Sequence, residues 1–293
     1  MKMLITGAAG QLGSELLRIA KEMNCSLGAI DRSYNNPDIM ALGAKELDIA
    51  DLPAVRNIVG RFRPDVIINT AAYTNVDGCE KEAEAAFKVN ALGARNVAIA
   101  AQETNSKLIH ISTDYVFPGG GSTPYREYDK TSPKSIYGKT KLLGEEYVRE
   151  FCKKYFIIRT SWLYGRNGRN FVRTILSEAK EKQYLEVVDD QKGCPTNAED
   201  LAYHILKIAV TDEYGVYHCS GNGECSWYEF AIKILEIAGI DCPVKPIKTN
   251  QLDRAAERPA YSVMDNMMLR LTVGDDMRSW EAAIEHFIKG LLI

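Results

Sequence analysis

The stretch Thr6-Gly7-Ala8-Ala9-Gly10-Gln11-Leu12-Gly13 decides the fold of this chain. It follows an apolar run at residues 3–6, and the apolar residues after it recur at helical spacing up to Met23. Three glycines let the backbone turn tightly and approach a pyrophosphate, which the N–H groups of a helix N-terminus bind. The spacing is G-x-x-G-x-x-G rather than G-x-G-x-x-G, so the position between strand and helix carries most of the weight, and glycines for packing are the alternative. The candidate phosphate-binding residues are Gly7, Gly10, Gln11, Leu12 and Gly13.

Short apolar runs alternate with helical segments through the first half of the chain. The runs lie at residues 3–6, 27–30, 65–70, 107–113 and 155–161, with helices expected at 51–62 and 80–104 among others. Unbroken apolar runs are typical of parallel strands covered on both faces. We therefore expect an α/β fold with a doubly wound, Rossmann-type parallel sheet. The expected dinucleotide-binding domain is 1–164, with roughly 190–218 returning to it, and 165–189 and 219–293 form a smaller C-terminal substrate lobe.

The composition gives no sign of a nucleic-acid or membrane partner. A net charge of -3 leaves no basic footprint for nucleic acid or an anionic membrane surface. No apolar stretch approaches the roughly 20 residues of a membrane span, and the N-terminal run is too short for a secretory signal. The 7 cysteines are scattered and form no metal-ligand pair, which indicates reduced thiols and a cytoplasmic location.

Asp31 ends the second apolar run, near the offset at which a carboxylate takes the adenosine ribose hydroxyls. That favours NAD, whereas Arg32 beside it would accept the 2′-phosphate of NADP. The sequence therefore predicts NADH or NADPH without choosing between them. A turn or helix-cap role is the alternative for Asp31.

Two further segments are candidates for cofactor contact. Asp48 and Ile49 are expected at the end of another strand, where they would lie against the adenine ring. Ala71, Ala72 and Tyr73 follow the run at 65–70, where small side chains suit close approach of a cofactor. They suit helix packing equally well.

Tyr137 and Lys141 are the expected acid–base pair, because side chains four residues apart share a helix face. The lysine charge would lower the tyrosine pKa from about 10 toward neutrality. Tyr137 could then exchange a proton with a carbonyl or alcohol oxygen while hydride moves at carbon. Tyr203 and Lys207 have the same spacing, but no phosphate loop or hydroxyl-bearing strand precedes them. We expect Tyr203 to pack and Lys207 to be solvated.

Ser112 and Thr113 end a strand at the edge where ligands bind in such sheets, so a hydroxyl there can hold the substrate oxygen. With the glycine loop and Y-x-x-x-K in this order, the chain resembles the extended short-chain dehydrogenase/reductase family. The resemblance implies that Tyr137 is the acid/base and that Lys141 lowers its pKa and binds the nicotinamide ribose. It favours Thr113 over Ser112 as the carbonyl ligand. Asn90 matches a family asparagine, although a mid-helix surface asparagine is an equally ordinary interpretation.

Longer stretches are similar to the dTDP-4-dehydrorhamnose reductases. They are STDYVFPG at 112–119, YGKTKLLGE at 137–145, RTSWLYG at 159–165, DQKGCPT at 190–196 and RPAYS at 258–262. The resemblance implies reduction of the 4-keto group of dTDP-4-dehydro-L-rhamnose to dTDP-L-rhamnose by NADH or NADPH. It implies substrate contacts at Thr113, Asp114 and Trp162, and Arg258 could pair with the diphosphate. The alternatives are a core position for Trp162 and a solvated loop position for Arg258.

Two other functions are compatible with the sequence. A nucleotide-sugar epimerase or dehydratase would keep the same apparatus, but Tyr115 stands where the similar dehydratases carry an acid. A non-catalytic regulatory subunit, resembling the beta subunit of methionine adenosyltransferase, is the second. Some members of the subfamily dimerise through Mg²⁺ held by glutamates, and Glu15 and Glu199 match two of them. The expected acid near the C-terminus is missing, so we assign no metal ligand and expect a monomer or homodimer.

Overall fold

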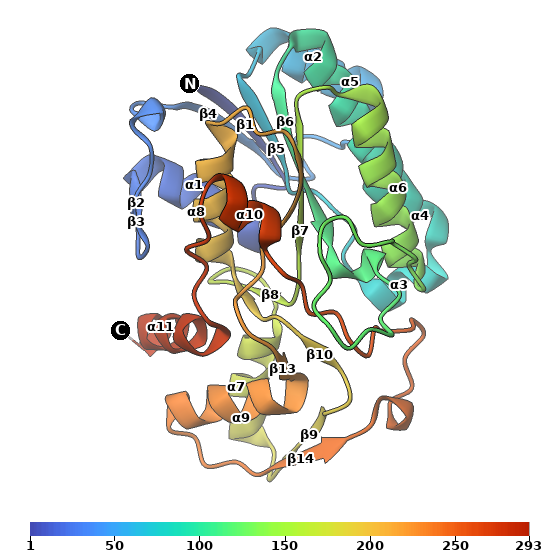
Figure 1. Ribbon diagram of the computed structural model, residues 1–293, viewed down its shortest axis with the longest axis vertical. Helices are drawn as coiled ribbons and strands as arrows, with labels where there is room; N and C mark the ends of the chain where they lie inside the picture. The colour runs from blue at the N-terminus through green and yellow to red at the C-terminus, as the bar shows by residue number, and fades with distance from the viewer. Residues whose placement is uncertain (293) are drawn as a thin grey trace.

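The centre of the computed structural model, which describes residues 1–292, is a six-stranded sheet (Figure 1). The strand order is β12-β7-β6-β5-β1-β4, and every neighbouring pair is parallel. The bounds are β1 (Lys2–Thr6), β4 (Asp38–Leu42), β5 (Val66–Asn69), β6 (Lys107–Thr113), β7 (Tyr155–Thr160) and β12 (Gly215–His218). The predicted doubly wound parallel sheet is thereby confirmed.

Helices cover both faces of this sheet. Successive strand residues point to opposite sides, so the apolar side chains of one strand pack against both helical layers. Met3 and Ile5 of β1 pack in one core cluster with α1 (Gln11–Glu22) and α8 (Ala198–Ala209). Leu4 faces the other way, into a cluster with α2 (Leu52–Phe62), α5 (Ala94–Thr104) and α6 (Ile136–Phe151). The strand interiors are therefore fully buried, which places ligand binding at the carboxyl edge.

A second core cluster lies beside the sheet domain, at the bottom of Figure 1. Its elements are β8 (Leu163–Tyr164), α7 (Phe171–Glu181), β9 (Leu185–Val188), β13 (Cys225–Ser226), α9 (Trp227–Ala238), β14 (Val244–Ile247) and α11 (Trp280–Leu292). The short strands β10 (Lys192–Gly193) and β11 (Thr196–Asn197) pair with β13 and β8 of this part. The turn η4 (Thr249–Gln251) follows β14, and α10 (Met267–Thr272) packs against β12 of the sheet. Leu269 and Met277, which the sequence assigned to the lobe, pack in the sheet-domain core instead.

Two expected elements differ from the prediction. The run at 27–30 does not enter the sheet; β2 (Asn24–Cys25) and β3 (Gly28–Ala29) form an antiparallel hairpin, followed by the turn η1 (Arg32–Tyr34). The expected helix at 80–104 is interrupted: α3 (Val76–Lys81) and α4 (Ala83–Phe87) lead into a π-helical turn, η2 (Lys88–Gly93), before α5. π-Turns occur frequently at functional sites.

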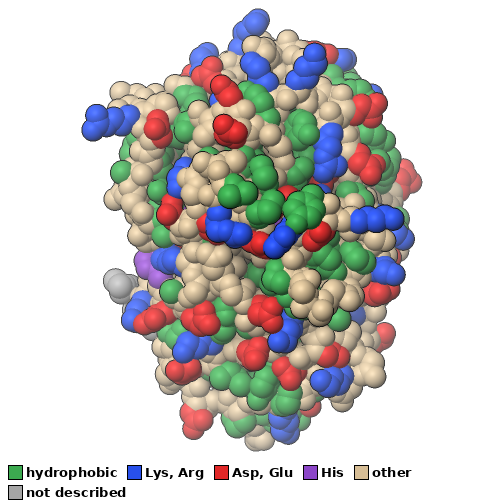
Figure 2. Space-filling view, in the orientation of Figure 1, with side chains coloured by type: hydrophobic (Ala, Val, Ile, Leu, Met, Phe, Trp, Pro, Cys, Tyr) green, Lys and Arg blue, Asp and Glu red, His purple; other side chains and the backbone are tan. Residues whose placement is uncertain are grey.

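Basic and acidic side chains are interspersed over the face of the molecule shown in Figure 2. Within residues 1–292, no helix combines the length and apolar character that crossing a bilayer requires.

Candidate active site

The glycine loop packs tightly between the ends of β1 and β5 and the start of α1. Gly7 has a left-handed φ of 66°, and a Cβ there would lie 2.6 Å from the backbone N of Ala71. A Cβ at Gly13 would lie 2.5 Å from the Gly7 carbonyl oxygen. Gly10 precedes α1 without a capping side chain, so the N–H groups of the first turn are free to bind phosphate. Larger side chains would close this cradle.

Asn90 holds the segment after β5 against α6. Its Oδ1 accepts the Tyr73 N–H at 2.8 Å, and its Nδ2 donates to the Tyr73 carbonyl at 3.1 Å and to Thr140 Oγ1 at 3.2 Å. The side chain is buried, so the surface interpretation of Asn90 is wrong. Ala71, Ala72 and Tyr73 are thereby fixed beside the glycine loop, where cofactor contact stays a prediction.

Asp31 lies near the C-terminal end of α1, and the glycine loop lies at its N-terminal end. The ribose role predicted for Asp31 is therefore wrong. The neighbouring Ile30 N–H donates to the carbonyl of Met23, the residue that ends α1. α1 has 12 residues, which separates its two ends by about 18 Å. Asp31 instead accepts the Ser33 N–H at 2.7 Å, the turn role that was its alternative. Arg32 lies in the same turn and is equally remote from the glycine loop.

The sheet strand that follows β1 along the chain is β4, and its carboxyl end reaches the glycine loop. The Ala8 N–H donates to the Leu42 carbonyl at 3.1 Å, so Gly43, Ala44 and Lys45 occupy the position predicted for Asp31. Asp48 and Ile49 lie in the loop after β4, not at a strand end as predicted.

The Ile49 carbonyl accepts from Asn96 Nδ2 at 3.0 Å, which ties that loop to α5. Adenine contact by Asp48 and Ile49 stays a prediction.

Tyr137, Lys141 and Thr113 converge at the carboxyl end of β6. Ser135 begins α6 by accepting the Gly138 N–H at 3.1 Å, which sets Tyr137 in the first turn. Lys141 Nζ donates to the Ile111 carbonyl at 2.5 Å, and the Thr113 hydroxyl lies near the Tyr137 side chain. The pair with the same spacing elsewhere lies outside this site: Tyr203 packs against the core as predicted, whereas Lys207 is half-buried and ion-paired with Asp276 instead of solvated.

Burial, not Lys141, dominates the ionisation of Tyr137. Burial raises the pKa of Tyr137 above its ordinary value, the Asp114 charge raises it further, and only the nearby Thr113 hydroxyl opposes them. The expectation that Lys141 brings this pKa toward neutrality is therefore wrong for the free enzyme. Burial likewise lowers the pKa of Lys141 to about 8, against the opposing charge of Glu145. The free site thus holds a protonated phenol.

Ser112 and Thr113 point into different surroundings, which separates the two candidate hydroxyls. Ser112 Oγ donates to Glu145 Oε1 at 2.5 Å, inside a buried pair in which Arg159 holds both carboxylate oxygens at 2.9 and 2.8 Å. Thr113 Oγ1 donates to Asp114 Oδ1 at 3.0 Å and faces Tyr137. The geometry favours Thr113 as the substrate ligand.

Asp114 and Ser262 bring unpartnered polar atoms to the same place. Both side chains are buried, and within residues 1–292 neither Asp114 Oδ2 nor Ser262 Oγ completes a hydrogen bond. Burial raises the pKa of Asp114 to about 6, although the nearby hydroxyls of Ser262 and Thr113 oppose that shift. Buried polar atoms without partners are costly, and substrate hydroxyls would satisfy them.

The other two substrate candidates are both engaged by protein groups. Trp162 has a left-handed φ of 46° and stacks on Trp227. Arg258 Nη2 and Nη1 bind the Asp77 carboxylate at 2.6 and 3.1 Å, so Arg258 straps its loop to α3. Contact of Arg258 with a diphosphate stays a prediction.

The chain is similar over its whole length to one family of known proteins. The family model described as RmlD substrate binding domain matches residues 1–293. The chain belongs to this family. A dTDP-4-dehydrorhamnose reductase of Clostridium acetobutylicum has a solved structure with TM-score 0.94 and 43% identity, covering 100% of both chains. One from Bacillus anthracis, in complex with NADP, gives TM-score 0.92 and 44% identity over 99% of each chain. The spore coat polysaccharide biosynthesis protein SpsK of Bacillus subtilis is 42% identical over 98% of this chain and 97% of its own length.

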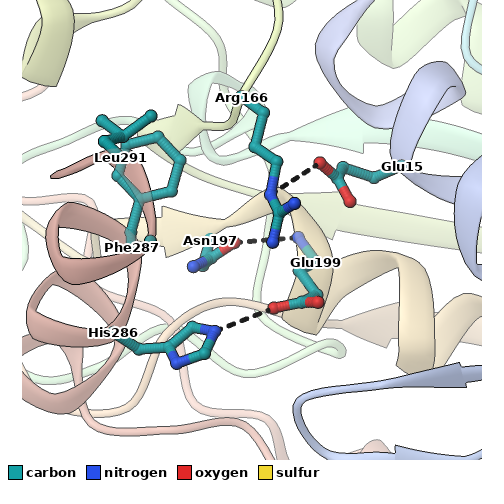
Figure 3. Close-up of a pocket in the computed structure, with 8 residues that line it drawn as sticks. Glu15, Arg166, Asn197, Glu199, His286, Phe287 and Leu291 are labelled. Carbon is teal, nitrogen blue, oxygen red and sulfur yellow. Dashed lines mark hydrogen bonds and ion pairs between the residues drawn. The ribbon is translucent and has the colours of Figure 1, made fainter. Parts of the chain in front are cut away.

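In this RmlD-family chain, Glu15 and Glu199 lie together and both bind the Arg18 guanidinium. Arg18 donates to Glu15 Oε2 at 2.9 Å and to Glu199 Oε1 at 2.6 Å. Arg166 and His286 approach the two carboxylates at 3.7 and 3.3 Å (Figure 3). No cluster of three metal-ligating side chains occurs in the part of the chain that the structure describes. Carboxylates already paired with cations do not fit Mg²⁺, which needs free oxygen ligands.

Three residues around the site of this RmlD-family chain were missed from the sequence. Lys45 lies shortly after another apolar run, at 39–42, which could have been recognised as a strand. Trp227 follows the capping residue Ser226, a signal for a helix start but not for contact with Trp162. Nothing in the sequence indicated that Ser262 lies beside Asp114, because the two residues are far apart in the chain.

Proposed function

We propose that this protein reduces the 4-keto group of dTDP-4-dehydro-L-rhamnose to dTDP-L-rhamnose, using a nicotinamide cofactor. The observation that supports this proposal most strongly is the convergence of Thr113, Tyr137 and Lys141 at the carboxyl edge of the sheet. The uncapped N-terminus of α1 lies at the same edge. The similar proteins of C. acetobutylicum and B. anthracis carry the name of this reductase. The cytoplasm suits an enzyme whose 7 cysteines are all free thiols.

Each residue has a defined task in this reaction. The free first turn of α1 would hold the cofactor diphosphate, and a bound nicotinamide would supply the hydride. Thr113 Oγ1 turns from Asp114 to hold the substrate carbonyl oxygen. Tyr137, whose raised pKa keeps it protonated, donates its proton to that oxygen as the alcohol forms. Lys141, anchored on the Ile111 carbonyl, presents its remaining N–H donors to the nicotinamide ribose.

Asp114 and Ser262 would orient the sugar. Their unpartnered oxygens lie beside Thr113, and both can bind sugar hydroxyls. Trp162 and Arg258 complete the substrate side at the junction with the lobe.

We also propose that NADPH is the preferred cofactor. The carboxyl end of β4 carries Gly43, Ala44 and Lys45 where a carboxylate would select NADH. The nearest acid in the sequence, Glu46, accepts the Gly43 N–H at 2.9 Å and is thereby engaged. Lys45 is exposed and makes no ion pair within residues 1–292, so it can meet a 2′-phosphate.

The ratio of kcat/KM for NADPH over NADH tests this preference. Lys45→Ala should lower that ratio about tenfold, the loss of roughly 1.4 kcal/mol of phosphate interaction. Arg32→Ala is the matched control, because Arg32 lies at the other edge and should leave the ratio unchanged. A ratio that responds to Arg32 and not to Lys45 would overturn the assignment.

The epimerase, dehydratase and regulatory alternatives are less well supported. The residue after Asp114 is Tyr115, so that position carries no acid for elimination. The Tyr115 ring packs edge-on against Tyr137, with ring centroids 5.4 Å apart. Oxidation of NADPH on adding dTDP-4-dehydro-L-rhamnose tests the main proposal. Stoichiometric formation of dTDP-L-rhamnose is expected; cofactor binding without oxidation would favour an epimerase or a regulatory subunit.

A further inference from the structure

Trp162 is held in a backbone conformation that large side chains rarely adopt. Its φ is 46°, in the left-handed region, where a bulky residue is an outlier. Such conformations persist only when the surrounding structure enforces them, and they cluster at ligand sites. The groups that enforce this conformation therefore matter for whatever Trp162 does.

The Thr196 N–H donates to the Trp162 carbonyl at 3.3 Å and holds the backbone, while Trp227 and Gly193 contact the Trp162 ring. The Trp162 and Trp227 rings stack with centroids 3.5 Å apart and an interplanar angle of 7°. A Cβ at Gly193 would lie 2.6 Å from Trp162 Nε1, so only glycine leaves room for the indole there. Trp162 is half-buried, which leaves part of the indole accessible beyond these contacts.

Trp227 is itself fixed by the lobe. Ser226 caps α9 by accepting the Glu229 N–H at 3.1 Å, and its hydroxyl donates to Asp189 Oδ1 at 2.7 Å. Behind Trp227, Phe171 lies at 4.5 Å between ring centroids, and the buried Phe230 supports Phe171. An aromatic column thus runs from the lobe core to Trp162.

The head of this column lies at the reacting edge of the sheet. Thr160 pairs in register with Thr113, and Trp162 follows two residues later. On the other side, the Ser262 N–H donates to the Lys192 carbonyl at 2.8 Å, next to Gly193. The indole, Ser262 and Thr113 therefore lie near the same carboxyl end of the sheet.

We propose that Trp227 is a positioning residue of the substrate site: its stacking on Trp162 fixes the indole that bounds the sugar-nucleotide pocket. This inference rests on the proposed function, because it takes the ligand of Trp162 to be a nucleotide sugar. Trp227 lends rigidity and need not touch the substrate. It links the packing of the lobe to substrate affinity.

The test compares Trp227→Ala, Trp227→Phe and Trp280→Phe in steady-state reduction, NADPH binding and circular dichroism. Trp227→Ala should raise the KM for the sugar nucleotide about tenfold, the upper range for one aromatic pair, without changing the Kd for NADPH. Trp227→Phe should restore most of that affinity. Trp280 packs on Phe230 in the same lobe and is the matched control. The exciton band of the stacked indoles should disappear in both Trp227 variants and persist in the control.

Gly193→Ala gives an independent arm if Trp227→Ala does not fold, since it should displace the same indole and raise the same KM. An unchanged or lowered KM in Trp227→Ala or in Gly193→Ala would overturn the inference. If the wild-type protein does not oxidise NADPH, binding of dTDP-L-rhamnose to the same variants decides separately. Weaker binding to Trp227→Ala would then uphold the positioning role while the proposed reaction fails.

Discussion

Replacing Asp114 by asparagine should stabilise the protein while damaging the active site. Burial raises the Asp114 pKa from 3.8 to about 6, so ionised Asp114 opposes folding. At 1.36 kcal/mol per pH unit, this shift corresponds to about 3 kcal/mol of lost stability above pH 6. An amide in its place carries no charge, keeps the Thr113 hydrogen bond, and can donate to the unpartnered Ser262 Oγ.

The sign of the pH dependence follows from the direction of this shift. The folded pKa lies above the unfolded one, so the folded state holds more protons between pH 4 and pH 6 and stability falls as pH rises through that window. The gain from Asp114→Asn should therefore be about 3 kcal/mol at pH 7.5 and about half of that at pH 5. The difference between the two pH values does not depend on how well the amide itself packs.

Urea unfolding of both proteins at the two pH values measures the gain, and the KM for the sugar nucleotide measures the functional loss. We expect KM to rise because a carboxylate that accepts sugar hydroxyls is lost. A stability difference that is the same at pH 5 and pH 7.5 would refute the raised pKa. A stabilised variant with parental KM would refute the substrate contact.

Three other predictions follow from contacts in and around the site. Tyr137→Phe should bind NADPH within about twofold of the parent yet lose about 10²–10⁴ in turnover, and a parental rate would contradict its role as acid. EDTA should change neither turnover nor molecular mass in solution, because Arg18 bridges the two glutamates of Figure 3; activity lost to EDTA and restored by Mg²⁺ would contradict this. Glu145→Gln should cost about 3–5 kcal/mol in urea unfolding, since it leaves the buried Arg159 charge unpaired, and a loss under about 1 kcal/mol would show that the pair is dispensable.

Features that depend on neighbouring residues were predictable from the sequence. The glycine loop, its flanking strand and α1 form within a few residues of one another, so the pattern specifies them directly. Tyr137 and Lys141 share a helix face whatever surrounds them. The strands at 107–113 and 155–160 are unbroken apolar runs that only a covered sheet can bury.

The choice of the second sheet strand was not predictable in this way. Residues 27–30 and 39–42 are apolar runs of equal length, and only pairing with β1 selects the later one. Gly28, with a φ of 124°, turns the earlier run into a hairpin at the far end of α1. Asp31 belongs to the discarded run, which is why its ribose role failed. The Tyr137 pKa was missed for a related reason, since helix spacing does not reveal how deeply a phenol is buried.

Several departures from ordinary protein structure meet at one edge of the sheet, and together they mark the site independently of any similarity. Trp162 is strained, and the buried oxygens of Asp114 and Ser262 lack partners within residues 1–292. Thr160 Oγ1, beside Thr113 in register, is another buried oxygen without a partner. Each departure costs stability in the free protein, and a ligand rich in hydroxyls would relieve the unpartnered oxygens. The stabilisation expected from Asp114→Asn is the measurable form of that cost, because the group that weakens the free fold is the one that we propose contacts the sugar.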